Sequence, residues 1–408
     1  MATTVTVRET RCTTGTPDTK RTSCRISALR SALLRPIVGS SVAFCRRQEA
    51  HSRLVSARST RQGRCRDGEL FAFASRVRPL VSFVIPVKND AQRLGRCLSS
   101  ILANDYPREL IEIIVIDNDS TDGSAGVARE HGAIVRSCAS RSVAELRNRG
   151  ARAALGSVIA FVDADHEIEP LWIGTAVGIL SDPAIAATGA AYLAEPCANW
   201  VQLQYDRLRD RPATRQDVNW LGSGNLAVKR LPFESVGGFN GQLTACEDVD
   251  LCNRLLGAGH RIVADPGLRS VHFGDPRTLK ALFLGELWRG RDNLRVTFSG
   301  PRTLRHFRSA LVPVTVLALL AGGLLALLIG YPGLALGCWL LAVAPAALKA
   351  SYMLRWRWGH ADGMARPERD VVVAGRRAVE ALAVAVVFDM ARALALLARG
   401  SHRARRSA

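Results

Sequence analysis

The stretch GSVIAFVDAD, residues Gly156–Asp165, joins a run of apolar residues to two carboxylates. Val158–Val162 is short, apolar and bounded by polar residues, which is typical of a buried parallel strand. Asp163 and Asp165 follow this strand, and residues two apart in an extended chain project to the same side. In open α/β sheets ligands bind at the carboxyl ends of the strands. Two carboxylates at that edge suit Mg²⁺ or Mn²⁺ carrying a diphosphate.

The preceding segments predict that this strand belongs to an α/β domain. Leu80–Val87 and Ile111–Ile116 are apolar runs typical of buried strands, and Ala133–Val135 is a shorter one. Between Leu80–Val87 and Ile111–Ile116, apolar residues recur at helical spacing, from Leu94 onward. Strands that alternate with helices imply a parallel, doubly wound sheet.

The charge of the chain is concentrated at its beginning. The chain has 408 residues and a net charge of +19, and residues 1–78 hold 16 Lys and Arg against 5 Asp and Glu. Few aromatic residues accompany these cations, and no zinc-finger, helix-turn-helix or RNP-type pattern is present. We therefore expect no nucleic-acid partner. Ten cysteines without a C-x-x-C pair predict a reducing, cytosolic environment.

The composition divides the chain into three parts. Residues 1–76 are rich in Ser, Thr and Arg, and we expect a basic, disordered extension. An organellar targeting segment and a start site assigned too far upstream remain alternatives. Residues 77–300 form the expected α/β domain, and residues 301–408 form the expected membrane region.

The membrane region contains two uncharged stretches. Residues 309–330 carry no charge over 22 residues, enough for a helix to cross a bilayer, and 332–348 form a second expected span. Arginines precede the first span and Lys349 follows the second, so the positive-inside rule puts both ends in the cytoplasm with the catalytic domain. Residues 379–398 contain Asp389 and Arg392, and this segment either crosses as a third span or lies in the interface.

Further motifs follow in a fixed order. They are the Asp-rich loop DNDSTDGS (117–124), ELRNRG (145–150) followed by ALG (154–156), GSGN (222–225), GGFN (237–240), EDVDL (247–251) and the late His272. In order and spacing, these motifs and DAD at 163–165 resemble the inverting family 2 glycosyltransferases of GT-A fold. The resemblance extends over Leu80–Arg295, about half of the chain.

The resemblance implies a nucleotide-sugar site. Its nucleotide-binding residues would include Pro86, Asn89, Asp117 and Asp119, and in the family Asp117 accepts a hydrogen bond from the base, a geometry that favours uracil. Arg147 would approach the diphosphate, with a plain surface charge as the alternative. Gly224 and Asn225 would lie beneath the donor sugar and the acceptor.

The resemblance also implies a metal site and a base. Asp165 would bind the divalent cation directly, Asp163 would contact the ribose or the cation, and His272 would complete the metal shell. Asp248 would be the general base that deprotonates the acceptor, with Glu247 orienting the acceptor or the base. Asp250 has a structural explanation at a helix start, where the backbone dipole favours acids.

One departure from the family argues against a polymerase. Processive members carry a Gln-x-x-Arg-Trp motif, whereas the corresponding region here reads GELWRG (285–290). We therefore expect transfer of a single sugar from a UDP-linked donor to a lipid-linked or membrane-proximal glycan. A polyprenyl-phosphate sugar synthase is the first alternative. A GT-A-like membrane scaffold without turnover is the second.

Overall fold

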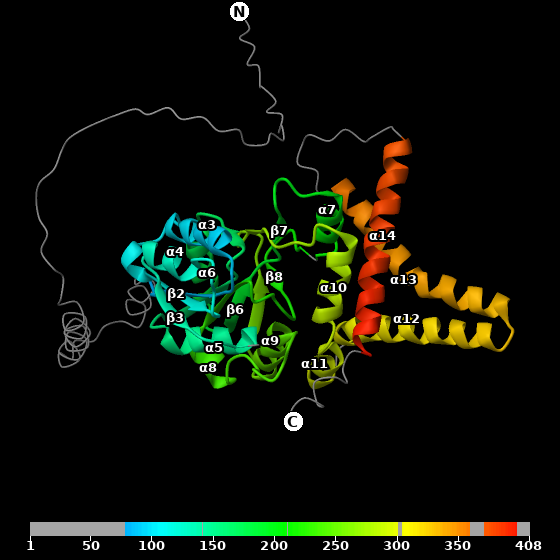
Figure 1. Cartoon of the computed structure of the whole chain (residues 1–408). Coiled ribbons are helices and arrows are strands. Elements are labelled where there is room, and N and C mark those ends of the chain that lie inside the picture. The colour runs from blue at the N-terminus through cyan, green and yellow to red at the C-terminus, as the bar shows by residue number, and fades with distance from the viewer. Residues whose placement is uncertain (1–77, 141, 210, 301–303, 360–370, 398–408) are drawn as a thin grey trace, which may run out of the picture. The chain divides into compact units, whose positions relative to one another are not determined.

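The computed structural model describes residues 78–140, 142–209, 211–300, 304–359 and 371–397. The extension expected over residues 1–76 lies outside these ranges. Figure 1 shows an α/β domain whose sheet is covered by helices on both faces, followed by long helices toward the C-terminal end.

An eight-stranded mixed sheet forms the centre of the domain, in the order β3-β2-β1-β4-β9-β6-β10-β8. Its strands are β1 (Val81–Val87), β2 (Ile111–Asp117), β3 (Ile134–Ser137), β4 (Val158–Val162), β6 (Ile185–Gly189), β8 (Gln216–Asp217), β9 (Asn225–Lys229) and β10 (Arg261–Ala264). The first four are parallel, as the sequence predicts. The whole sheet is mixed, because two strands beyond those predicted are antiparallel: β9 between β4 and β6, and β8 beside β10.

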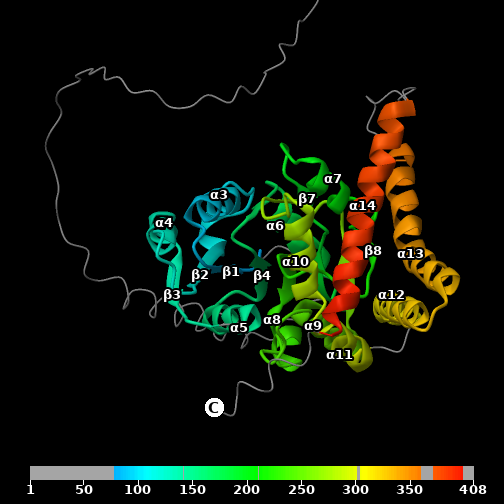
Figure 2. The same ribbon diagram turned by 45° about the vertical axis from the view of Figure 1, so that its right-hand side comes forward.

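Helices cover the two faces of the sheet and connect its strands. They are α3 (Ala91–Leu102), α4 (Ser124–Glu130), α5 (Val143–Ala153), α6 (Trp172–Leu180), α7 (Trp200–Asp206), α8 (Arg230–Ser235) and α9 (Glu247–Gly257), with a 3-10 turn η1 (Arg108–Leu110). In Figures 1 and 2, α3, α4 and α6 lie on one face and α5, α8 and α9 on the other. The alternation of strand side chains explains the two layers, because Phe83 and Ile85 pack toward Leu94 and Trp172 while Val84 packs on the opposite side.

Helix α5 lies unusually close to β1. A Cβ added at Gly150 would come within 2.2 Å of the Val84 side chain, so only glycine fits at this contact. The close contact fixes the position of the whole helix. Arg147, one turn earlier on α5, is thereby held in the interior, where it is 3% exposed.

A second, three-stranded sheet lies beside the first, in the order β5-β11-β7. Its strands are β5 (His166–Ile168), β7 (Leu193–Ala194) and β11 (Ser270–His272). Strands β5 and β11 are antiparallel, and their register places His272 directly opposite His166. Side chains opposite each other on one face of an antiparallel pair are neighbours, so this register brings two histidines from distant parts of the chain together.

Five helices form the C-terminal part of the described chain. They are α10 (Leu279–Arg289), α11 (Asn293–Ser299), α12 (Leu304–Leu328), α13 (Pro332–Gly359) and α14 (Val371–Ala395). Two of them contain stretches long and apolar enough to cross a membrane, Ser309–Leu328 and Pro332–Leu354, close to the two expected spans. Helix α14, which begins earlier than the expected 379–398 segment, lies along α10 in both ribbon views.

Candidate active site

Three side chains form a group suited to a metal ion. The ligand atoms of Asp165, His166 and His272 all lie within 4.8 Å of one another, and His272 Nε2 is 3.2 Å from Asp165 Oδ2. The sequence predicted Asp165 and His272 as ligands, and the structure brings them together. His166 was missed, although it directly follows the Asp-Ala-Asp motif. Only the register between β5 and β11 reveals it.

Hydrogen bonds orient both imidazoles of this group. His272 Nδ1 lies 2.8 Å from Asp275 Oδ1, and Asp275 also pairs with Arg209. His166 Nδ1 lies 3.1 Å from the Ser270 hydroxyl. With each Nδ1 engaged in this way, the Nε2 atoms are left to act as ligands, the arrangement usual for metal-binding histidines.

The environment shifts the protonation of these groups in opposite directions. Burial lowers the pKa of His166 to about 4, which keeps its imidazole neutral at physiological pH. Burial also acts to lower the pKa of His272, but hydrogen bonds with Asp165 and Asp275 raise it to about 9. Burial would raise the pKa of Asp165, yet the hydrogen bond with His272 holds it well below its usual value.

Two glycines leave room around the metal-ligand group. A Cβ at Gly224 would lie 2.7 Å from Asp163 Oδ2 and 3.1 Å from His166 Nε2. A Cβ at Gly274 would lie 2.1 Å from Asp165 Oδ2 and 2.8 Å from His272 Nε2. Any larger residue at either position would occupy the space beside the ligand atoms. Gly224, predicted to lie beneath the donor sugar, is thus brought to this group.

Arg147 joins Asp163 to the second half of the site. Its Nη2 is 2.7 Å from Asp163 Oδ1, and its Nη1 is 2.7 Å from Glu247 Oε1. Among the described residues, its buried Nε has no hydrogen-bond partner. The alternative of a surface charge is wrong, because the side chain lies in the interior. Asp163 turns one oxygen to Arg147 and is not a member of the group of three ligands.

The predicted base stands at the start of α9. Asp248 Oδ1 accepts a hydrogen bond of 2.8 Å from the Val249 amide, and burial together with the neighbouring Glu247 raises the pKa of Asp248 to about 7. Asp250 accepts two bonds from Arg254 on the same helix, at 2.9 and 2.7 Å. The structure therefore accounts for Asp250 without a part in catalysis.

A short loop connects the two halves. A Cβ at Gly222 would lie 3.9 Å from Asp248 Oδ2, while Gly224, two residues on, faces Asp163 and His166. Two residues of chain span about 7 Å at most. The carboxylate of Asp248 and the metal-ligand group therefore stand at opposite ends of one short segment.

The nucleotide-binding residues predicted from the sequence lie at the ends of β1 and β2. Asp117 ends β2 and is 5% exposed, its Oδ1 accepting from the Ser120 amide at 3.2 Å. Asn89 Oδ1 accepts a hydrogen bond from the Thr121 amide at 2.8 Å, and this bond connects the end of β1 to the Asp-rich loop. Asp119 in that loop is exposed, and Pro86 is partly buried within β1.

Asn225 begins β9 and is buried. Its amide donates to the carbonyl oxygens of Ala190 and Leu268 at 3.0 and 2.8 Å and accepts from the Trp172 indole at 2.8 Å. Both ends of the amide are thus engaged in the core. The residue supports the strand behind Gly224.

Two further residues near the metal-ligand group were not predicted from the sequence. Arg93 on α3 donates to the Phe273 carbonyl at 3.0 Å and has a guanidinium nitrogen 3.9 Å from Asp165 Oδ2. The Tyr192 ring lies 4.9 Å from the His166 ring and 4.6 Å from the His272 ring, centroid to centroid. Neither residue belongs to a recognisable motif, so the sequence offered no signal for them.

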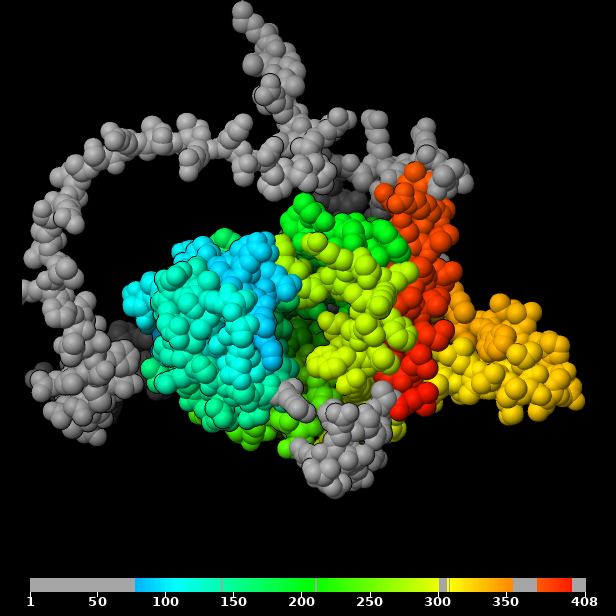
Figure 3. Space-filling model, in the orientation of Figure 1, coloured from blue at the N-terminus to red at the C-terminus, as the bar shows by residue number. Residues whose placement is uncertain are grey.

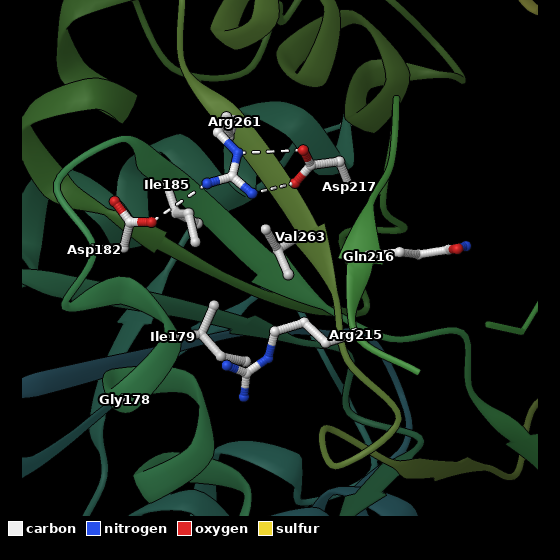
Figure 4. A pocket seen from close by; sticks show the side chains of 9 residues that line it. All are labelled: Gly178, Ile179, Asp182, Ile185, Arg215, Gln216, Asp217, Arg261 and Val263. Carbon is white, nitrogen blue, oxygen red and sulfur yellow. Dashed lines mark hydrogen bonds and ion pairs between the residues drawn. The ribbon is translucent and has the colours of Figure 1, made fainter. Parts of the chain in front are cut away.

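The surface has a depression between the segments that carry α3 and α10 (Figure 3). Figure 3 shows a depression between the blue segment that carries α3 and the yellow-green segment that carries α10, with green residues on its floor. A separate pocket lies at the β8 edge of the sheet, where Arg261 pairs with Asp217 at 2.9 Å and with Asp182 at 3.3 Å (Figure 4). None of the predicted site residues lines that pocket, and we assign no ligand to it.

Comparison with known proteins relates part of the α/β domain to one family. The family described as Glycosyl transferase family 2 matches residues 82–229. Glycosyltransferase AglE of Haloferax volcanii is 26% identical over 193 residues, 45% of this chain and 64% of that protein. Pre-mycofactocin glycosyltransferase of Mycobacterium tuberculosis is 28% identical over 215 residues, 48% of this chain and 43% of that protein. The chain thus spans less than two thirds of both relatives.

A solved structure is also similar in part. Mannosyltransferase PcManGT from Pyrobaculum calidifontis, in complex with GDP-Man and Mn²⁺, is 20% identical with a TM-score of 0.46, covering 77% of this chain and 88% of that one. The family match begins in β1 and ends in β9, and so includes the strand that leads to Asp163 and Asp165. Over residues 82–229, the α/β domain of this chain, with its GT-A-like mixed sheet, is therefore similar to the family 2 glycosyltransferases.

Proposed function

We propose that the protein transfers a single sugar from a nucleoside diphosphate sugar, UDP-linked, to a lipid-linked or membrane-proximal glycan, with inversion at the anomeric carbon. The observation that carries this proposal is the Gly222–Gly224 segment, which faces Asp248 at one end and the metal-ligand group at the other. Transfer needs an acceptor hydroxyl and a donor diphosphate on opposite sides of one sugar carbon. A base and a metal-ligand group at the two ends of one short segment meet that requirement.

The donor side would depend on a divalent cation. The residues fit such an ion, since Asp165 offers a carboxylate oxygen, His166 and His272 offer imidazole nitrogens, and Gly224 and Gly274 leave space beside them. Imidazole ligands favour Mn²⁺ over Mg²⁺, which prefers oxygen. When bound, the cation would neutralise the charge that develops on the departing diphosphate.

Two arginine side chains, Arg93 and Arg147, contribute positive charge to the donor side of the site. Arg93 reaches toward Asp165 from α3 and remains 38% exposed, so its guanidinium is available to a phosphate oxygen. Arg147 is committed to Asp163 and Glu247 and is buried. We therefore assign Arg147 to holding the two acids in place, and Arg93 to the diphosphate contact that the sequence suggested for Arg147.

The acceptor side would depend on Asp248. A carboxylate with a pKa of about 7 is ionised in half of the molecules at neutral pH and takes a proton more readily than an ordinary aspartate. Glu247, tied to Arg147 at 2.7 Å, keeps the start of α9 fixed beside the donor half. The hydroxyl attacks from the side opposite the leaving group, which is the origin of inversion.

The C-terminal helices support a membrane location for the acceptor. The apolar stretches Ser309–Leu328 and Pro332–Leu354 would anchor the protein as a hairpin, with the catalytic domain in the cytoplasm. An enzyme held at a membrane meets lipid-linked or membrane-proximal acceptors first. The segment GELWRG forms the end of α10 and includes Gly290 after it, and without the Gln-x-x-Arg-Trp motif we propose one transfer per encounter.

The test is a donor screen with the purified full-length protein in detergent or nanodiscs. A panel of UDP-, GDP- and TDP-sugars is incubated with Mn²⁺ and membrane lipid extract, and the release of nucleoside diphosphate and the labelled lipid products are measured. We expect one UDP-sugar to be consumed only when Mn²⁺ is present. Release from no donor would support the scaffold alternative, and a sugar phosphate on a polyprenol would support the synthase alternative.

A further inference from the structure

A buried ion pair joins the last described helix to the catalytic domain. Glu286 on α10 is fully buried, and its Oε2 accepts from Arg392 Nε on α14 at 2.7 Å. Its Oε1 accepts from the Tyr205 hydroxyl at 2.6 Å and from Arg289 at 3.0 Å. Both oxygens of the carboxylate are therefore satisfied, and one of the donors comes from a residue 106 positions later in the chain.

The end of α10 leads directly to the segment before the proposed base. Asp292, just beyond α10, accepts from the Thr244 amide at 2.8 Å, from the Thr244 hydroxyl at 2.7 Å and from the Ala245 amide at 3.2 Å. The Arg289 carbonyl accepts from the Cys246 thiol at 3.4 Å. We call residues 244–248 the base loop. Its first three residues are all bonded to the stretch 289–292.

Helix α14 closes on the same stretch. A Cβ at Gly290 would lie 2.6 Å from Ala395 Cβ and 3.3 Å from Arg392 Cδ. The last turns of α14 thus pack against the turn that carries Asp292, without space for another side chain. Figures 1 and 2 both show α14 lying along α10.

We propose that Arg392 is a positioning residue, which holds the end of α10 and through it the base loop in the geometry that acceptor deprotonation requires. The segment after the apolar hairpin is then part of the catalytic machinery rather than an accessory of the anchor. Without Arg392, the Glu286 carboxylate would stay buried with one charged partner fewer, and the end of α10 would shift to reach water. The rate part of this inference rests on the proposed function.

The test compares full-length variants by hydrogen–deuterium exchange and by kinetics. Arg392→Met removes the charge and retains much of the side-chain length. Arg376→Met is the matched control, because Arg376 lies on the same helix, is largely exposed and pairs with Glu380 at 2.8 Å. We expect about tenfold faster amide exchange at residues 244–248 in Arg392→Met, with β2 unchanged as an internal reference. The control should exchange like the parent.

Kinetics separate positioning from general damage. In Arg392→Met we expect transfer to fall about tenfold while donor affinity, measured by calorimetry with the UDP-sugar and Mn²⁺, stays within about twofold. Arg392→Lys, which keeps a charge near Glu286, should recover part of the rate. If Arg392→Met does not fold, the double variant Glu286→Gln with Arg392→Met removes both buried charges and should fold with a rapidly exchanging base loop.

The inference would be overturned if amides 244–248 exchange as slowly in Arg392→Met, or in the folded double variant, as in the unsubstituted protein. So would an equal loss of donor affinity and of transfer, which would indicate a structural role for the whole domain. A failure of the proposed function is recognised separately. In that case the unsubstituted protein consumes no donor, whereas the exchange comparison still tests the link between Arg392 and the base loop.

Discussion

Replacing Asp248 by asparagine should make the protein less active and more stable. The substitution preserves the size of the side chain and an oxygen to accept the Val249 amide, but it cannot take a proton from the acceptor. We expect transfer to fall by ~10²–10⁴, the usual contribution of a positioned base. Donor affinity should change little, because Asp165, His166 and His272 are untouched.

The gain in stability follows from the pKa of Asp248. Its ordinary value of 3.8 is raised to about 7 in the folded protein, so the folded state holds the proton more tightly than the unfolded chain. The carboxylate therefore destabilises the fold progressively from about pH 4 to pH 7, and fully above pH 7. Raising the pKa from 3.8 to about 7 corresponds to about 4 kcal/mol. Because solvent still reaches part of this side chain, we expect about half of that, about 2 kcal/mol.

Two measurements test this reasoning. Thermal unfolding at pH 8 should place Asp248→Asn about 4–8 °C above the parent, and the difference should shrink toward pH 4. The transfer rate of the parent should rise through about pH 7 and then level off, since the base acts only when ionised. Asp250→Asn, which breaks the Arg254 pair, is the control and should keep the parental pH profile. A parental rate that is flat from pH 5.5 to pH 8, or an Asn variant less stable at pH 8, would refute the argument.

Two further predictions concern the metal-ligand group. Asp275→Asn should weaken Mn²⁺ binding about 10–100-fold, because Asp275 acts through His272, and His166→Ala should weaken it more. Electron paramagnetic resonance measures the Mn²⁺ affinity of both variants. Unchanged affinity in both would count against the ligand set. Gly224→Ala should fold normally but lose Mn²⁺ and donor affinity, because its Cβ would lie 2.7 Å from Asp163 Oδ2. The control Gly222→Ala, whose Cβ would have nothing nearer than 3.9 Å, should retain Mn²⁺ affinity. If Gly224→Ala binds Mn²⁺ and donor as well as the unsubstituted protein, the space beside the ligands is not used.

The sequence predicted the parts of the fold that local patterns encode. Apolar runs marked β1, β2 and β4, and the acids at their ends marked the edge where the site lies. Strand β9 was not recognised, because NLAVK is short and its pairing with β4 depends on contacts more than 60 residues apart. The direction of such a strand follows from tertiary structure, which local periodicity does not contain.

The candidate site was predictable to the same degree. Asp165, His272 and Asp248 stand in recognisable motifs, and the structure brings them to one region. His166 depends on a cross-strand register, and the engagement of Arg147 with both Asp163 and Glu247 depends on the close contact of α5 with β1. These relationships join residues up to about 100 positions apart, so no local pattern signals them.

Because Glu286 pairs with a residue far later in the chain, this ion pair forms only late in protein synthesis. A ribosome adds about 5–20 residues per second, so the 106 positions between the two residues take roughly 5–20 s to translate. During that interval the sheet is already complete and the apolar helices α12 and α13 are synthesised, while the Glu286 carboxylate still lacks its late partner. Completion of the base loop would therefore wait for α14, and the proposed transfer would begin only after that helix has left the ribosome.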